Sequence, residues 1–361
     1  MRLVPLAEAR AAFLAKIAPA ASISMATAKG GGLVVAEDIL APVNIPATAL
    51  ALERGYALAS RATVGASSYL PAMLTIMPPL IEAGDALPAG TDAIADKDDV
   101  RETPPAEIIA PVAPGRRVRA AGGDFAAGKV MVSAGSRLQA SQIAVLRAAG
   151  IKELPVRMPA VTILAPRGSC PAAALVMDMV AQASGDVQVA YVPEPRLASA
   201  LGSAGSADLV LVAGWSGAAH HAAISGLAKS GRVVARDLAV APGTTMACGF
   251  VGADSAAPVV LLPGRLEETL AAWLMLARPA LDRLAGFAGS RPSAALPLAR
   301  KIASAPGMVD IAFVRRQEDK WNPLAVGDIS WTALAQAEAW LAVRGESEGF
   351  APGEIVEAEF L

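Results

Sequence analysis

Between residues 159 and 287, continuous apolar runs alternate with segments that have the spacing of helices. The apolar runs predict strands at residues 161–165, 187–191, 208–213, 232–236 and 258–262. The intervening segments predict helices at residues 172–183, 218–229 and 266–285. Strands that are apolar throughout are typical of a parallel sheet covered by helices on both faces. The sequence therefore predicts a doubly wound α/β domain over residues 159–287, with ligands bound beyond the carboxyl ends of its strands.

The rest of the chain divides into ranges of different character. Residues 26–119 are rich in Pro and Gly and carry only short apolar runs, which predicts a β-rich domain without long helices. Residues 1–25, predicted to be helical, combine with residues 120–158 in a mixed α+β domain. Residues 288–361 return to short strands and predict a C-terminal β-rich, barrel-like domain. The expected fold class is therefore a multidomain α/β protein.

Local signals place a few elements within these ranges. Strands are expected at residues 129–132 and 151–157, with a helix at residues 142–149 between them. Ser141 suits the N-cap of that helix, and Gly150 suits its end. A second helix is expected at residues 332–339 in the C-terminal range.

Charge and hydropathy exclude several classes of partner. The chain has 31 Lys and Arg against 33 Asp and Glu, which leaves no strong positive field for nucleic acid or an anionic membrane. No apolar run reaches the roughly 18–20 residues of a membrane-spanning helix. Glu8, Arg10 and Lys16 interrupt any signal-peptide core, so a cytoplasmic protein is expected.

The cysteines and histidines give weak chemical signals. Cys170 and Cys248 form no CxxC pair, which suits a reducing compartment and predicts buried, inert thiols. His220 and His221 are adjacent and have no third ligand at zinc-like spacing, so we expect no metal site, although a site built on them is an alternative. Ser216 and His220 are four residues apart, and a catalytic dyad of the two is another alternative.

Four glycine-bearing loops follow predicted strands or open predicted helices. Small residues there let backbone N–H groups approach a ligand, and a helix N-terminus attracts anions. The loops predict a site for a phosphate- or pterin-sized ligand, although each could also be a tight turn that needs glycine for geometry alone. The candidate contacts are Arg167, Gly214, Ser216, Gly217, Pro242, Gly243, Thr244, Pro263 and Gly264.

A series of short motifs, in order along the chain, resembles one known family. The motifs are residues 32–42 (GLVVAEDILAP), 87–94 (LPAGTDAI), 118–124 (VRAAGGD), 135–138 (GSRL), 242–243 (PG), 262–264 (LPG), 315–316 (RR) and 352–354 (PGE). Nearly the whole chain thereby resembles the molybdopterin molybdenumtransferase family, that is MoeA and the E domain of gephyrin. The resemblance implies an elongated, four-domain homodimer that acts in molybdenum cofactor biosynthesis.

The resemblance also implies a ligand and partners. The ligand would be molybdopterin or adenylated molybdopterin, bound by the 159–287 domain. A molybdoenzyme or another cofactor-assembly protein would be a further partner. In the family's reaction, adenylated molybdopterin is cleaved and molybdate is placed on the dithiolate, with magnesium and lysines neutralising the negative charge.

Several family residues are replaced in this chain. The acids of M-D-G-Y-A, S-T-G-D-E and G-G-V-S-V-G-x-x-D correspond to Arg54, Gly168 and His221, and the lysines of K-P-G-K-P correspond to Ala241 and Thr244. We therefore expect no magnesium site at these positions. Asp124 is a retained family acid, and Glu53 and Asp85 are candidate replacements, so these three carboxylates are the catalytic candidates. The replacements leave three hypotheses, which are a divergent transferase, a non-catalytic scaffold that binds molybdopterin or a molybdoenzyme, and a dimer that has lost the ligand.

Overall fold

The computed structural model describes residues 3–102, 105–168, 170–183, 185–252 and 257–361. The chain forms two compact units, which are described separately. Unit 1 comprises Met1–Glu37, Ala134–Ile143 and Glu153–Leu361, and unit 2 comprises Asp38–Ser133 and Ala144–Lys152. This division is coarser than the four domain ranges of the sequence analysis, which stay a prediction.

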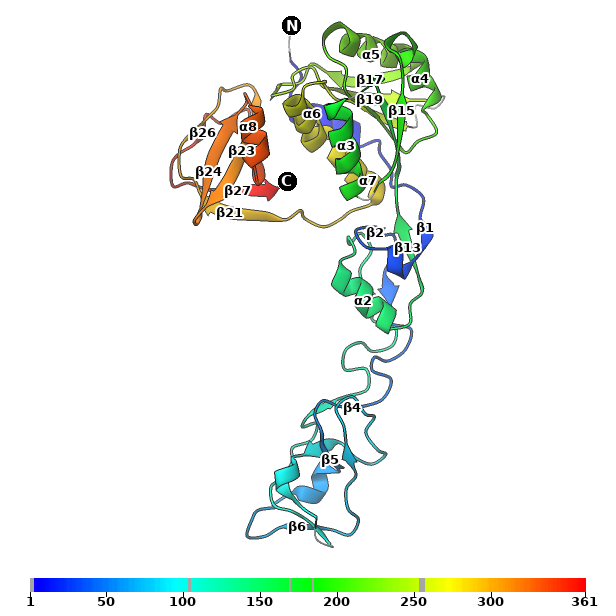
Figure 1. Ribbon diagram of the computed structural model, residues 1–361, viewed down its shortest axis with the longest axis vertical. Coiled ribbons are helices and arrows are strands. Elements are labelled where there is room, and N and C mark those ends of the chain that lie inside the picture. Colours follow the sequence, from blue (N-terminus) through cyan, green and yellow to red (C-terminus); the bar gives the residue numbers. More distant parts are fainter. Residues whose placement is uncertain (1–2, 103–104, 169, 184, 253–256) are drawn as a thin grey trace. The chain divides into compact units, whose positions relative to one another are not determined.

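The centre of unit 1 is a six-stranded sheet (Figure 1). Its strands, in spatial order, are β15 (Asp186–Tyr191), β14 (Ala160–Ala165), β16 (Leu209–Val212), β20 (Ala257–Leu261), β19 (Ala247–Val251) and β17 (Gly231–Arg236). The first four run parallel, whereas β19 runs antiparallel to both β20 and β17. The prediction of a wholly parallel sheet was therefore wrong at this edge. The connections at residues 237–246 and 252–256 are shorter than a parallel crossover requires, and the sequence pattern had missed β19.

Helices cover both faces of this sheet, as predicted. On one face α1 (Leu6–Leu14), α3 (Pro171–Gln182), α6 (Leu266–Ala272) and α7 (Arg278–Ala285) contribute to one buried cluster. On the other face lie α4 (Leu197–Ser203), which the sequence analysis missed, and α5 (Gly217–Ser230). Alternate residues along a strand belong to the two buried clusters, one on each face of the sheet. In β16, for example, Leu211 belongs to the first and Val210 to the second.

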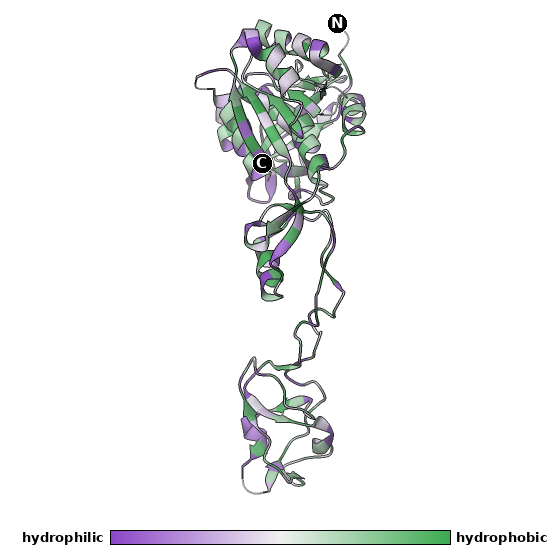
Figure 2. Ribbon diagram, turned by 90° about the vertical axis from the view of Figure 1, so that its right-hand side faces the viewer, coloured by the Kyte–Doolittle hydropathy of each residue, from purple (hydrophilic) through white to green (hydrophobic). Residues whose placement is uncertain are grey.

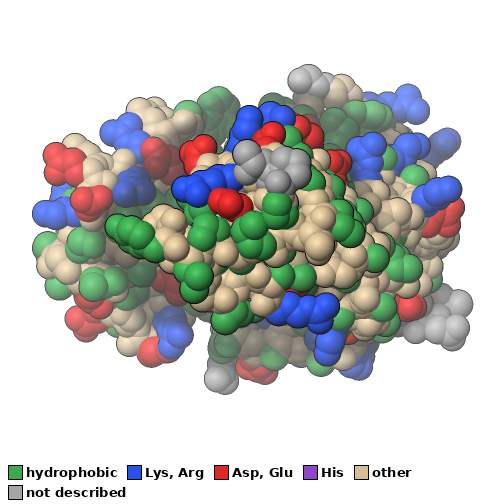
Figure 3. Space-filling model, turned by 90° about the horizontal axis from the view of Figure 1, so that it is seen from below, with side chains coloured by type: hydrophobic (Ala, Val, Ile, Leu, Met, Phe, Trp, Pro, Cys, Tyr) green, Lys and Arg blue, Asp and Glu red, His purple; other side chains and the backbone are tan. Residues whose placement is uncertain are grey.

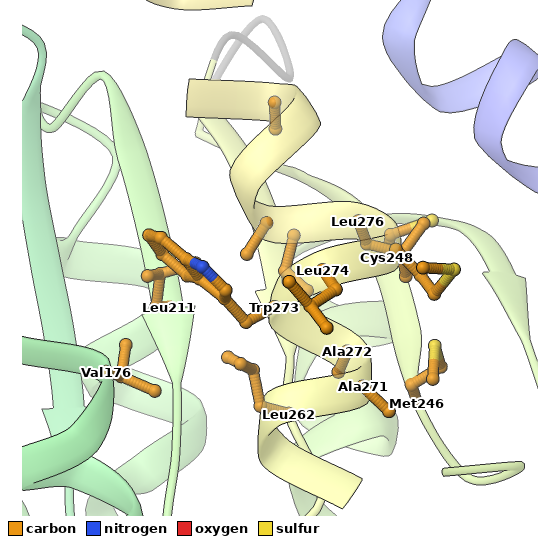
Figure 4. Packing of buried hydrophobic residues seen from close by; sticks show 14 of the residues in the cluster. Val176, Leu211, Met246, Cys248, Leu262, Ala271, Ala272, Trp273, Leu274 and Leu276 are labelled. Atoms are coloured by element: carbon orange, nitrogen blue, oxygen red, sulfur yellow. The ribbon is translucent and has the colours of Figure 1, made fainter. Parts of the chain in front are cut away.

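The predicted 266–285 helix is present but contains a π-helical turn at Trp273–Ala277, between α6 and α7. Pro279 follows that turn and has no N–H to donate, so a regular α-helix would lose a backbone hydrogen bond there. The side chain of Trp273 is 2% exposed and packs with Val176 and Leu211 (Figure 4).

The N-terminal helix is shorter than predicted. α1 ends at Leu14 rather than continuing to residue 25, because Pro19 lies ahead and the chain becomes extended. β1 (Ile23–Ala26) and β2 (Val34–Val35) then pair with β13 (Glu153–Arg157) in a three-stranded sheet of unit 1.

The second helix, α2 (Ala140–Ala148), begins before its predicted N-cap, so the assignment of Ser141 as N-cap was wrong. Instead, the Gln139 N–H donates a hydrogen bond to Oε1 of Gln142, a side chain of the helix itself, at 2.9 Å. Gly150 ends the helix as predicted, with a positive φ of 78°.

The C-terminal part of unit 1 is mainly antiparallel β-structure. Its sheet contains β18 (Val240–Ala241), β23 (Val309–Gln317), β25 (Ala339–Val343), β27 (Ile355–Phe360) and β21 (Ser293–Pro297), with β24 (Lys320–Val326) paired to β23. β22 (Ile302–Ala303) pairs with β26 (Gly349–Phe350). α8 (Trp331–Gln336) ends earlier than predicted because β25 begins at Ala339. β18 is a segment of the 237–246 connection that pairs in parallel with β23.

Unit 2 is β-rich, as predicted, and its described residues 38–102 and 105–133 form no α-helix. Its short strands are β3 (Ile39–Leu40), β4 (Leu50–Ala51), β5 (Gly55–Leu58), β6 (Ala72–Leu74), β7 (Leu80–Ile81), β8 (Ala93–Ala95), β9 (Val100–Arg101), β10 (Ala106–Ile108), β11 (Val118–Arg119) and β12 (Val130–Val132). They form small sheets that enclose a core around Tyr56 and Ile108.

The surface of unit 2 carries exposed apolar side chains between residues 64 and 80 (Figure 3). The largest exposed fractions are those of Val64, Tyr69, Leu70 and Ile76. In unit 1, by contrast, the strands of the six-stranded sheet are largely apolar and buried (Figure 2). Across the described ranges, the helices are all too short or too polar to traverse a bilayer.

Candidate ligand-binding site

The loops after β14, β16 and β20 lie at one edge of the six-stranded sheet, because these strands are parallel and adjacent. The hydrogen-bond ladder continues into the loops. The Ala213 N–H donates to the Leu164 carbonyl at 3.0 Å, and the Leu262 N–H donates to the Val212 carbonyl at 2.8 Å. The expectation that these loops converge on one edge is therefore confirmed.

Glycine permits direct contact between these loops. A Cβ on Gly264 would lie 2.4 Å from Oγ of Ser216, and a Cβ on Gly214 would lie 2.2 Å from Sγ of Cys170. Neither position could carry a larger side chain without moving the neighbouring loop. These close contacts support the interpretation that the loops need glycine for their geometry. That interpretation is compatible with a ligand bound at the same edge.

The 241–245 loop joins the same edge from the connection between β17 and β19. Nε2 of His220, in the second turn of α5, lies 2.9 Å from the carbonyl oxygen of Thr245. A Cβ on Gly243 would lie 3.5 Å from the carbonyl oxygen of Glu268 in α6. All four loops predicted from the sequence are therefore connected to this edge, directly or through α5 and α6.

The amino end of α5 is the most polar part of the site. Ser216 is its N-cap, yet the hydroxyl of Ser216 makes no capping hydrogen bond, and Ser216 and Gly217 are exposed. The free N–H groups of a first helical turn and the helix dipole favour a bound anion. Arg167 is exposed on the loop after β14 and has no carboxylate partner among the described residues. These groups suit a phosphate or another oxyanion.

A small hollow of about 230 Å³ adjoins the loop after β14. It is lined by Gly168, Cys170, Pro171, Ala173, Ala174, Met177, Val189 and Tyr191. Cys170 is half-buried there, so the prediction of an inert buried thiol was wrong for this residue, whereas Cys248 is fully buried. The hollow supplies an apolar wall next to the polar amino end of α5.

Two carboxylates in the first turn of α6 also lie near this edge. The sequence analysis gave them no role in the site, although they follow the Pro263–Gly264 turn directly. Glu267 is 3% exposed and forms an ion pair with Arg265. Burial raises the pKa of Glu268, and the charge of Glu267 adds to this effect, while Arg265 opposes it.

The three catalytic candidates all belong to unit 2. Asp124 pairs with Arg119 at 3.3 Å, and Glu53 pairs with Arg117 at 3.0 Å. Asp85 accepts a hydrogen bond from the Glu82 N–H at 2.9 Å. Each carboxylate is thus engaged in a surface contact near the β4–β11 pair, while the glycine-bearing loops belong to unit 1.

The residues at the replaced family positions make contacts of their own. Arg54 forms an exposed ion pair with Glu82 at 3.0 Å. Nδ1 of His221 lies 2.8 Å from the carbonyl oxygen of Gly217, one turn earlier in the same helix. Gly168 has a φ of 102° and lines the small hollow.

This donor set does not fit magnesium, which prefers carboxylate oxygens and water. Throughout the described ranges, no three His, Cys, Asp or Glu side chains are grouped so that they could hold a metal ion. The alternative roles of the histidines receive no support either. His220 is bonded to Thr245 rather than to Ser216, and His221 is bonded to its own helix.

Comparison with known proteins finds a family that is similar to the N-terminal part of the chain. Residues 4–150 match the family model described as the MoeA N-terminal region, domains I and II. A molybdopterin molybdenumtransferase of Synechococcus elongatus is 28% identical over 145 residues, and this match spans 35% of the present chain and 36% of that protein. The N-terminal part of the chain is therefore similar to the MoeA family.

Solved structures extend the likeness in fold to the full chain. The molybdopterin biosynthesis MoeA protein of Pyrococcus horikoshii has a TM-score of 0.83 at 21% identity, with 100% of both chains covered. A molybdenum cofactor biosynthesis protein of Pyrococcus furiosus has a TM-score of 0.66 at 18% identity, again over 100% of both chains. The predicted MoeA-like, multidomain α/β fold is therefore confirmed. This fold brings together the loops of the candidate site.

Proposed function

We propose that this chain acts in molybdenum cofactor biosynthesis by binding molybdopterin, or its adenylate, at the carboxyl edge of the six-stranded sheet. One observation carries the proposal: glycine-bearing loops from three parallel strands meet beside the amino end of α5. The position corresponds to the place where open α/β sheets bind ligands. The family resemblance narrows the ligand class to molybdopterin.

Two parts of the site suit two parts of the ligand, the anionic phosphate and the aromatic pterin. The free N–H groups of the α5 amino end and the Ser216 hydroxyl would hold the phosphate. The guanidinium of Arg167 would neutralise part of its charge. The small hollow beside Cys170 has apolar walls that suit the pterin ring. Gly264 and Gly214 keep the loop backbones close, so the site is formed before the ligand arrives.

For the reaction itself, we propose the transfer that the relative from Synechococcus elongatus is named for, in which molybdate is placed on molybdopterin. Positive groups and helix N–H donors can stabilise negative charge on a departing phosphate. A magnesium-dependent step is not assigned to this chain, because the residues present do not fit that ion. Glu268 is a half-buried carboxyl group of α6 near this edge, and burial raises its pKa.

The test uses the purified full chain with adenylated molybdopterin and molybdate. Pterin fluorescence reports binding, and chromatography of released AMP reports cleavage. We expect binding, and Ser216→Ala should weaken it about tenfold through one lost hydrogen bond to a charged group. Ser225→Ala is the matched control, since Ser225 is an exposed serine further along the same helix. Absence of binding by the unaltered chain would contradict the proposal.

The same experiment separates the transferase from the non-catalytic scaffold. AMP release that depends on the protein would favour the transferase. Binding without AMP release would favour the scaffold, which the replacement of family acids by Arg54, Gly168 and His221 also favours.

We further propose that the chain acts in the cytoplasm as a homodimer. A molybdoenzyme or another cofactor-assembly protein would then receive the product. These partners follow from the family resemblance, and the dimer is tested at the scale of the whole molecule below.

A further inference from the structure

We propose that His220 is a positioning residue that fixes the 241–245 loop against α5 and thereby sets the shape of the molybdopterin site. The ligand named here rests on the proposed function. The role of His220 in holding the loop does not, because it can be measured without any ligand.

The contact is specific to one ring nitrogen. Nε2 of His220 lies 2.9 Å from the Thr245 carbonyl oxygen, and a carbonyl can only accept a hydrogen bond. Nε2 must therefore carry the proton and donate it. Nδ1 is then left as an acceptor, and it is buried with no hydrogen-bond partner among the residues that the structure describes.

The unpartnered Nδ1 indicates that the imidazole is present for the hydrogen bond made by its other nitrogen. The side chain is 1% exposed, and an unsatisfied acceptor at such a position costs free energy. A leucine or methionine could fill the same volume without that cost. The benefit that offsets it is the Nε2–H bond, which a hydrocarbon side chain cannot make.

The bond also joins two elements that carry predicted ligand contacts. α5 presents Ser216 and Gly217 at its amino end, and the loop presents Gly243 and Thr244. Other polar contacts of this connection run within it, such as Leu238 N–H to the Thr244 carbonyl at 2.8 Å and Met246 N–H to the Gly243 carbonyl at 3.0 Å, or join it to β23 through β18. His220 therefore supplies the side-chain hydrogen bond that ties this connection to α5.

Both the neutral Nε2–H tautomer and the protonated ring can donate to the Thr245 carbonyl, and the surroundings favour the neutral form. Burial lowers the pKa of His220, and neighbouring His221 acts in the same direction. The bond to Thr245 and the carboxylate of Asp237 oppose the effect but do not outweigh it. A neutral ring with its proton on Nε2 is the tautomer that holds the loop.

The experiment compares amide hydrogen exchange across residues 238–247 in the unaltered chain, His220→Leu and His220→Gln. The amide of Gln can donate from nearly the position of Nε2, whereas Leu cannot donate. We expect exchange in the loop to become roughly tenfold faster in His220→Leu and to stay near the unaltered rate in His220→Gln. His221→Gln is the matched control and should leave exchange in the loop unchanged.

Each outcome is decisive. Unchanged exchange in His220→Leu would overturn the proposal, as would equally fast exchange in the Leu and Gln variants. Exchange in β14 and β16 is followed in the same samples, and unchanged protection there shows that the variants are folded. If β14 and β16 lose protection in His220→Leu, His220→Met replaces it as the variant that fills the volume without a donor. Faster loop exchange in His220→Met than in His220→Gln supports the proposal, and equal exchange in the two overturns it.

Ligand binding is measured separately with adenylated molybdopterin. We expect at least tenfold weaker binding by His220→Leu and near-normal binding by His220→Gln. Equal affinity of all three proteins would overturn the role of the loop position in the site. If the unaltered chain does not bind, the proposed function fails, while the exchange comparison still decides whether His220 holds the loop.

Discussion

At the scale of single residues, the two cysteines of the chain differ in how deeply they are buried. Cys248 lies inside β19, where burial raises its pKa to about 12. Cys170 is half-buried at the amino end of α3, with its Sγ facing Gly214. The thiolate is the reactive form of cysteine, so the raised pKa of Cys248 and its burial both disfavour reaction there, whereas Cys170 is accessible.

We predict that iodoacetamide at pH 8 modifies Cys170 and leaves Cys248 intact in the folded protein. Peptide mass spectrometry after labelling would measure both sites, and Cys170→Ser should remove the fast-reacting group. Because Cys170 lines the candidate site, the modified protein should also bind molybdopterin more weakly. Preferential labelling of Cys248 would contradict the packing described here.

His220 leads to a prediction for pH. Its pKa is lowered by folding, so the unfolded chain takes up a proton near pH 6.5 before the folded chain does. The stabilisation from the neutral ring is present above pH 6.5 and is progressively lost as the pH falls towards the lower, folded pKa. Urea unfolding of the unaltered chain and His220→Gln at pH 7.5 and 5.5 measures this. The Gln variant should lose less stability between these pH values, and an identical loss in both proteins would contradict the prediction.

At the scale of elements, the sequence was informative wherever apolar patterning was strong. The buried strands β14, β16 and β20 and the helices α3 and α5 were predicted almost to their ends, because their apolar residues are uninterrupted or regularly spaced. β19 was missed because its sequence, Ala-Cys-Gly-Phe-Val, contains a glycine and lies in a turn-rich region. The antiparallel pairing of β17 could not be predicted without it, because β17 pairs with β19 and otherwise runs in the same direction as β14, β16 and β20.

The candidate site was predictable in its loops but not in its side-chain contacts. Glycine after a buried strand is a local signal, and it pointed correctly to the sheet edge. The bond from His220 to Thr245 joins residues 25 positions apart and depends on how α5 packs, which no local pattern encodes. Glu267 and Glu268 suit a helix start by their charge alone, so the sequence does not signal that they lie near the site.

Gly264 supplies a prediction about the packing of these loops. In Gly264→Ala, the new Cβ would collide with Ser216 and with the backbone of Trp215, so the loops after β16 and β20 must separate. We expect the variant to lose about 1–3 kcal/mol of stability and to bind molybdopterin at least tenfold more weakly. Gly31→Ala is the matched control, because a Cβ at Gly31 meets open space. Thermal unfolding and ligand titration would measure the two effects.

At the scale of the whole molecule, Asp282 connects several parts of unit 1. This nearly buried carboxylate of α7 contacts Arg291 at 2.6 Å, Arg137 at 3.3 Å and Arg278 at 3.4 Å. Arg137 precedes α2 and Arg291 precedes β21, so the three arginines come from separate stretches of the chain. Asp282 therefore links helix α7 to the segment before α2 and to the segment before β21.

We predict that Asp282→Asn destabilises the protein by about 3–5 kcal/mol, because three partly buried guanidinium groups lose their common counter-charge. Urea unfolding at pH 7 measures the change. Asp319→Asn is a suitable control, since that carboxylate forms an exposed pair of a kind that contributes little. A loss of less than 1 kcal/mol in Asp282→Asn would show that the arginines are solvated well enough without it.

The proposed homodimer is also tested at this scale. Light scattering at micromolar concentration should give a mass close to twice the 36.5 kDa of the chain. We expect the mass to fall towards that of one chain only on strong dilution. A single-chain mass at micromolar concentration would count against the dimer without affecting the fold.

The two-residue strand β18 has a practical consequence for dissecting the protein. It follows β17 along the chain and leads into the 241–245 loop. Its partner β23, however, belongs to the C-terminal sheet. A polypeptide cut after residue 287 would keep every strand of the six-stranded sheet but would leave β18 without its partner. In such a fragment, the connection that carries the 241–245 loop would lose its pairing with the C-terminal sheet. The C-terminal segment is therefore part of the ligand site's framework, and the α/β domain should not be studied as a self-sufficient binding module.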